Sequence, residues 1–77
     1  MTMTSYRDVS GRSGIDAYEA RSTAIHIRFK HNREIYVYDH SVPARKMVDE
    51  MKRLAISGEG LSTYISQVVK DRYAKKI

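Results

Sequence analysis

Residues 51–76 have the sequence MKRLAISGEGLSTYISQVVKDRYAKK and decide the fold of this 77-residue chain. One apolar helical pattern ends at the Gly58-Glu59-Gly60 turn, and a second begins directly after it. The second pattern places apolar side chains at helical spacing over four turns, at Leu61, Tyr64, Ile65, Val68, Val69 and Tyr73. Two glycines between two amphipathic patterns predict a sharp corner between two helices, with Gly58 as the left-handed residue that ends the first.

The first of these helices is predicted to begin near Pro43, because proline cannot join a strand ladder but suits the first helical turn. We expect Ser41 or Val42 as its N-cap, since the Ser41 hydroxyl can accept a hydrogen bond from a free backbone N–H. Its apolar stripe is formed by Ala44, Met47, Val48, Met51, Leu54 and Ala55. Its opposite face carries charge pairs typical of a solvated helix, namely Arg45 with Asp49, Lys46 with Glu50, and Asp49 with Arg53.

Ahead of the helices the sequence predicts an antiparallel hairpin. In residues 23–30, TAIHIRFK, the side chains alternate between two faces, as is typical of a half-buried strand. One face carries Ile25, Ile27 and Phe29, and the other carries Ala24, His26, Arg28 and Lys30. Residues 34–39, EIYVYD, are rich in β-branched and aromatic side chains and form the returning strand. The turn lies at residues 31–33, where Asn32 tolerates a positive φ. Residues 15–19 allow a short additional strand at the edge of the sheet.

The predicted fold class is therefore α+β, with an antiparallel β-hairpin or three-stranded sheet followed by two helices packed on one face, in the order (β)ββαα. Residues 1–13 are rich in Ser, Thr and Gly without an apolar period, and we expect a disordered N-terminal segment there. Residues 14–77 would form a single domain with a net stability of about 3–5 kcal/mol. Because the chain has no cysteine for a disulfide, self-association is the remaining way to add stability, so we expect a monomer or a weak homodimer.

The length of the hairpin loop decides which side chains share a face, because strand side chains alternate. With two or four loop residues, Tyr36 and Tyr38 would wall the core, as tyrosines on a small sheet often do. With three loop residues, the same two tyrosines would stand on the open face beside His26, Arg28 and Lys30. That second arrangement would be an aromatic and cationic platform on which bases could stack.

The net charge of +5 is the main indication of function in the sequence. Residues 61–77 contain four cations and one acid, and cations near a helix C-terminus can simply complement the helix dipole. The alternative interpretation is a patch that binds phosphate groups of RNA or DNA. The candidate phosphate contacts are Arg28, Lys30, Arg33, Lys70, Arg72, Lys75 and Lys76, and the candidate base-stacking residues are Tyr36 and Tyr38.

Catalytic and metal-binding patterns are missing from the sequence. It has no cysteine and no G-x-S-x-G elbow, and its three histidines fall on a strand, a turn and a loop without ligand spacing, so each is expected at the surface. We therefore expect no enzyme, no catalytic residue, no metal and no cofactor.

The N-terminus lacks the apolar region of a secretory signal, and no apolar run approaches the roughly 20 residues that span a bilayer. We expect no membrane contact and a cytoplasmic location.

Residues 14–65 resemble the KTSC domain family, which is named for its occurrence at the C-terminus of some lysyl-tRNA synthetases. The matching motifs are Ile15 with Tyr18-Glu19, then Ile25-His26-Ile27-Arg28-Phe29, Tyr36-Val37-Tyr38, Val42-Pro43 and Ser62-Thr63-Tyr64-Ile65. Ser62 stands where the family usually has Asn, the hairpin turn lacks the usual Gly, and two connections are about one residue longer. The resemblance implies mainly an architecture, and it implies nucleic-acid contact only by association with the synthetases.

A rival resemblance is to ribbon–helix–helix repressors, which combine one strand, a Pro-started helix, a Gly-containing turn and a second helix. Residues 36–73 follow that order, and the resemblance implies a dimer whose paired strands enter the major groove of DNA. In that arrangement Glu34, Tyr36 and Tyr38 would face the bases. The preceding strand at residues 23–30 would, however, compete with the dimer partner for the same strand edge.

These observations predict a small non-enzymatic module, with nucleic-acid binding as the first hypothesis. A protein-interaction or structural module, whose partner is another protein or a second copy, is the alternative from a different class. The repressor-like dimer is the third.

Overall fold

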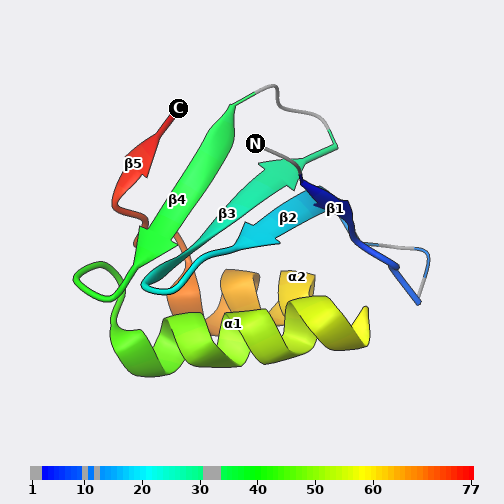
Figure 1. The fold of residues 1–77 in the computed structure, drawn as a ribbon. Helices are drawn as coiled ribbons and strands as arrows, with labels where there is room; N and C mark the ends of the chain where they lie inside the picture. Colours follow the sequence, from blue (N-terminus) through cyan, green and yellow to red (C-terminus); the bar gives the residue numbers. More distant parts are fainter. Residues whose placement is uncertain (1–2, 10, 12, 31–33) are drawn as a thin grey trace.

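The computed structural model describes residues 3–9, 11, 13–30 and 34–77. Five strands form one antiparallel sheet in the order β1-β2-β3-β4-β5, and two helices cover one of its faces (Figure 1). The strands are β1 (Thr4–Ser5), β2 (Ile15–Ala20), β3 (Ala24–Phe29), β4 (Ile35–Asp39) and β5 (Lys75–Lys76). The helices are α1 (Arg45–Ser57) and α2 (Leu61–Tyr64), and α2 continues as the π-helix η1 (Ile65–Val69). The α+β class is confirmed, whereas the sheet has more strands than predicted.

The hairpin of β3 and β4 adopts the even register. Ile27 lies opposite Tyr36 and Ile25 lies opposite Tyr38, so both tyrosines share the helix-covered face with the apolar side chains of β3. The prediction that the tyrosines wall the core is confirmed, and the open aromatic platform is not formed. The turn predicted at residues 31–33 lies outside the described residues.

The N-terminal segment differs from the disordered lead-in that was predicted. β1 pairs with β2, and Tyr6, directly after β1, is only 6% exposed within the core. The backbone N–H of Val9 also donates a 2.8 Å hydrogen bond to the carbonyl of Gly58. A single aromatic side chain in a polar segment gives no periodicity, which is why the pattern did not reveal this packing. As a result β2 is an inner strand and not the predicted edge.

The corner between the helices matches the prediction at Gly58. Gly58 has φ 82°, and its N–H donates to the carbonyl of Leu54, so it ends α1 as a left-handed C-terminal residue. The start of α1 differs, because Ala44 is the N-cap and no side chain caps the helix. The N–H groups of Ser41 and Val42 donate instead to Oδ1 of Asp39, which holds the loop before the cis Val42–Pro43 bond.

The outer face of α1 carries only part of the predicted charge pattern. Arg45 and Asp49 form an ion pair at 3.8 Å. Arg53, however, pairs with Glu50 and not with Asp49. Such exposed pairs contribute a few tenths of a kcal/mol each, so neither decides the fold.

The second helix is much shorter than the four turns predicted. The α-helical part ends at Tyr64, η1 ends at Val69, and Lys70 has φ 58°, which turns the chain back towards the sheet. The guanidinium of Arg72 donates to the carbonyls of Val68 and Val69 and so satisfies the end of the helix. Lys75 and Lys76 form β5 and do not extend the helix, so the idea that they complement a helix dipole is wrong.

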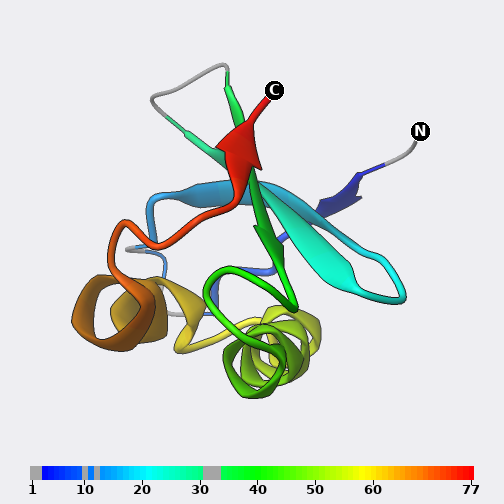
Figure 2. The same ribbon diagram turned by 90° about the vertical axis from the view of Figure 1, so that its left-hand side faces the viewer.

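The core lies between the sheet and the two helices, which run side by side on the same face of the sheet (Figure 2). Its largest fully buried side chains come from both layers, namely Ile15, Ile25, Ile27, Tyr38, Val48, Met51, Leu61 and Val69. Burial of each such side chain contributes about 1.5–3 kcal/mol. Val68, which the helical pattern placed on the apolar stripe, is exposed because the π-helix shifts the phase of the last turn.

Candidate ligand pocket

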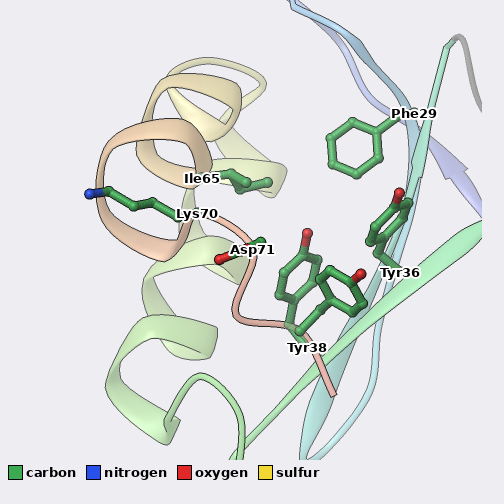
Figure 3. Close-up of a pocket in the computed structure, with 7 residues that line it drawn as sticks. Phe29, Tyr36, Tyr38, Ile65, Lys70 and Asp71 are labelled. Carbon is green, nitrogen blue, oxygen red and sulfur yellow. The ribbon is translucent and has the colours of Figure 1, made fainter. Parts of the chain in front are cut away.

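A pocket of about 350 Å³ lies between the sheet and the end of η1. Its lining is mainly aromatic, with one cation and one acid at the end of the helix: Phe29, Tyr36, Tyr38, Ile65, Lys70, Asp71 and Tyr73. Figure 3 shows the aromatic rings of the sheet facing Ile65 across the gap, while the Lys70 amine is directed away from the rings. The volume is at the lower end of the range for small-molecule sites.

The aromatic rings of the pocket contact one another edge to face. The ring centroids of Phe29 and Tyr36 are 5.3 Å apart at an interplanar angle of 88°, and those of Tyr36 and Tyr73 are 4.8 Å apart at 83°. Tyr38 and Tyr73 form a third such pair at 6.3 Å. These contacts are worth about 0.5–1.5 kcal/mol each beyond area burial, so they fix the walls of the pocket.

Tyr38 brings a phenol group to this pocket. The residue is 2% exposed, and burial raises the pKa of its phenol because the charged phenolate is disfavoured away from water. The neighbouring Tyr36 and Tyr73 raise the pKa further. Among the residues that the structure describes, no partner bonds to the Tyr38 hydroxyl. The pocket is therefore lined by a protonated hydroxyl that can donate to or accept from a bound molecule.

The backbone is unusual where the pocket meets the helix. Lys70 combines φ 58° with ψ −129°, a region that side-chain-bearing residues rarely adopt. It directly follows the π-helix. Such segments are rare in proteins, and those that do occur are frequently found at functional sites. Strained residues of this kind cost about 1–3 kcal/mol and cluster at binding and active sites. The π-helix and the unusual conformation of the residue that ends it thus lie at the same edge of the pocket.

Lys76 lies against the aromatic rings without lining the pocket. Its ammonium is 5.2 Å from the ring centroid of Tyr36 and 5.7 Å from that of Tyr73, within the range of cation–π attraction. It also forms an ion pair with Glu34 at 3.7 Å. Glu34 is the main reason that the pKa of Lys76 is raised, with smaller effects of Tyr36 and Tyr73.

Most of the predicted phosphate contacts are engaged by groups of the same chain. Arg28 pairs with Asp16 and Lys30 pairs with Asp8, each at 2.9 Å, and the hydrogen bond from Lys30 is the main cause that lowers the pKa of Asp8. Arg72 and Lys76 have the partners described above. Lys70 and Lys75 form no ion pair within the described part of the chain. Arg33 lies outside the described residues.

The predicted base-stacking tyrosines do reach a candidate site, but a different one from the open platform. Tyr36 and Tyr38 line the pocket on the helix-covered face, together with Lys70. Phe29, Asp71 and Tyr73 also line the pocket and were not predicted as site residues. Phe29 and Tyr73 had been assigned to the core, and the only available sign was the number of aromatic residues with core periodicity.

The opposite face of the sheet holds a second unusual feature. Glu19, His26, Val37 and Lys75 form one row across four strands. Nδ1 of His26 and Oε1 of Glu19 are buried without a hydrogen-bond partner, and His26 is 7% exposed, not the surface histidine that was predicted. Burial is the main cause that lowers the pKa of His26. No group of three or more potential metal ligands occurs among the described residues.

Comparisons with family models, with curated proteins and with solved structures return no match for this chain. Within the described ranges, no helix is long and apolar enough to cross a membrane.

Proposed function

We propose that the protein is a non-enzymatic module that binds single-stranded nucleic acid, with a base held in the aromatic pocket. The observation that carries this proposal is the pocket itself, where four aromatic rings lie next to Lys70, a cation without an ion pair among the described residues. The net charge of +5 supports attraction of a polyanion over longer distances.

The chemistry of the pocket favours an unpaired base over a duplex. Stacking of a base on an aromatic side chain contributes about 1–3 kcal/mol and tolerates any base, because every base has a π-face. A base within a double helix is already stacked and paired, and it cannot enter a recessed pocket. Single-stranded RNA or DNA is therefore the expected ligand.

The repressor-like alternative receives less support from the geometry. A ribbon–helix–helix dimer needs a free strand edge at residues 35–39. In this chain β4 pairs with β3 on one side and with β5 on the other, so both of its edges are used within the chain. The kinship with KTSC domains remains a proposal that rests on the sequence motifs.

A binding assay tests the proposed function. Fluorescence anisotropy would follow a labelled single-stranded RNA or DNA oligonucleotide as the full chain is added at several salt concentrations. We expect binding at about 50 mM salt and a log-linear fall in affinity as salt rises, because released counterions oppose binding. Absence of binding at that salt, or an affinity independent of salt, would reject the proposal.

Two matched variants locate the binding. Tyr73→Leu removes a pocket ring and should weaken binding, whereas Tyr64→Leu changes a partly buried tyrosine outside the pocket lining and should not. Equal losses in both variants would move the site away from the pocket. A concentration-dependent mass by light scattering, without nucleic-acid binding, would instead favour the protein-interaction module.

A further inference from the structure

We infer that the pocket holds a single nucleotide, with its base among the aromatic rings and its phosphate on Lys70, so that a nucleoside monophosphate is the smallest complete ligand. This inference rests on the proposed function and adds the size of the ligand and the position of its charge.

The walls of the pocket leave space for one flat group. Consecutive rings stand nearly perpendicular, at 88° for Phe29 with Tyr36 and 83° for Tyr36 with Tyr73. A base that stacks on one ring therefore meets the edge of the next ring and cannot be followed by a second base in a continuous stack. The volume of about 350 Å³ is also close to the minimum for a small-molecule site. The neighbouring bases of a longer strand would remain outside.

Lys70 is the cation best placed to meet the phosphate. The residue lines the pocket and is exposed, although its amine is directed away from the rings in the conformation that Figure 3 shows. Its flexible four-carbon stem allows the ammonium to reach a phosphate at the rim while the stem stays against the pocket. Lys76 is less suitable because its ammonium already contacts Glu34 and two rings.

Asp71 restricts how the nucleotide can enter. Its carboxylate repels a phosphate, which leaves the Lys70 side of the rim for the charged group. A carboxylate also accepts hydrogen bonds from sugar hydroxyl groups or from an amino group of a base. Deeper in the pocket, the Tyr38 hydroxyl lacks a partner among the described residues and can bond to the polar edge of the base.

The test is a titration of the full ¹⁵N-labelled chain with four probes: uridine 5′-monophosphate, adenosine 5′-monophosphate, uridine and inorganic phosphate. We expect both monophosphates to shift the amide signals of Tyr36, Lys70 and Tyr73 and to displace a labelled oligonucleotide. Uridine should bind the same residues about tenfold more weakly, as expected from loss of a charge-assisted contact. Lys70→Met should remove this difference, and Lys46→Met, an exposed lysine on α1, should keep it.

The outcomes separate this inference from the proposed function. If the oligonucleotide binds through the pocket but neither monophosphate displaces it, the single-nucleotide site is rejected and the function stands. If uridine and its monophosphate bind equally to the unmodified chain, or if Lys70→Met keeps their difference, Lys70 does not hold the phosphate. Shifts from inorganic phosphate alone, without any response to the nucleotides, would also reject the inference. If no oligonucleotide and no nucleotide binds, both proposals fail.

Discussion

The hydroxyl of Tyr6 accepts a hydrogen bond from the backbone N–H of Leu61 at 3.3 Å, across 55 positions of the chain. Leu61 is the first residue of α2, and the first N–H groups of a helix have no partner within it. The N-terminal segment therefore completes the start of the second helix. Burial raises the pKa of the Tyr6 phenol more than this hydrogen bond lowers it, so the group stays protonated.

Replacing Tyr6 should show how much this contact contributes. Tyr6→Phe leaves the buried N–H of Leu61 without a partner and should cost about 1–3 kcal/mol of unfolding free energy. Tyr6→Ala also leaves a cavity and should cost about 3–5 kcal/mol. Urea denaturation would measure both, with Tyr18→Phe as a matched control that should change stability by less than about 0.5 kcal/mol. A Tyr6→Phe variant as stable as the control would mean that the hydrogen bond contributes nothing.

Gly58 should tolerate no side chain. A Cβ atom built there would lie 2.6 Å from Cβ of Arg7, and φ 82° is unfavourable for any side-chain-bearing residue. Gly58→Ala should therefore lose about 1–2 kcal/mol from backbone strain alone, and more from the contact with Arg7. Thermal unfolding would measure the loss. Gly14→Ala is the control, since nothing lies within 4 Å of its added Cβ, and an equal loss there would contradict the argument.

The buried His26 should make stability depend on pH. Its pKa is lowered mainly by burial, further by Arg21 and Lys75, and is partly restored by Glu19. A folded-state pKa below the ordinary value of 6.5 means that the unfolded chain binds the proton more readily. Stability is then complete above about pH 6.5 and falls as the pH drops below it, with a slope of at most about 1.4 kcal/mol per pH unit.

Urea denaturation between about pH 5 and 7.5 would test this linkage. The His26→Gln variant has no titrating group at this position, so its stability should vary less over that range than that of the unmodified chain. Parallel curves for the His26 variant and the unmodified chain would exclude His26 as the cause.

Tyr38→Phe should weaken ligand binding without lowering the unfolding free energy. Because the hydroxyl has no partner among the described residues, its removal should leave the unfolding free energy unchanged or slightly raised. The same change should weaken binding of uridine 5′-monophosphate by about threefold to tenfold, the worth of one hydrogen bond. Calorimetry would measure both quantities. Unchanged affinity would show that the hydroxyl does not contact the base, and a large loss of stability would point to a structural role.

Local patterns predicted the central part of the fold. Three local patterns each specify their own structure, and all three structures are present: the alternation at residues 25–30, the β-branched and aromatic run at 35–39, and the Gly58 turn. β1 and β5 are two-residue strands whose pairing comes from the sheet and not from their own side chains. The N–H of Ala74 donates to the carbonyl of Val37, and this tertiary contact overrides a spacing that was compatible with a helix.

The pocket could be predicted only in part, because tertiary contacts that no local pattern indicates form some of its walls. The core-facing register of Tyr36 and Tyr38 was one of the two arrangements expected from the sequence. Tyr73 was assigned to the stripe of a long helix, so no pattern could place its ring 4.8 Å from that of Tyr36. The early end of η1 at Lys70 creates this neighbour, and it depends on a backbone conformation that the residue type does not indicate.

One wall of the pocket belongs to a short segment at the edge of the sheet. The segment after Lys70 is held to β4 by the N–H of Ala74 and by a reciprocal pair of hydrogen bonds between Ile35 and Ile77, at the edge of the sheet. Short edge segments exchange their amide hydrogens through local openings that leave the rest of the fold intact. A ligand that binds only the closed form must stabilise that form by mass action. For such a ligand, occupancy of the pocket and protection of the Ala74 and Ile77 amides from hydrogen exchange both measure the equilibrium between the open and the closed form.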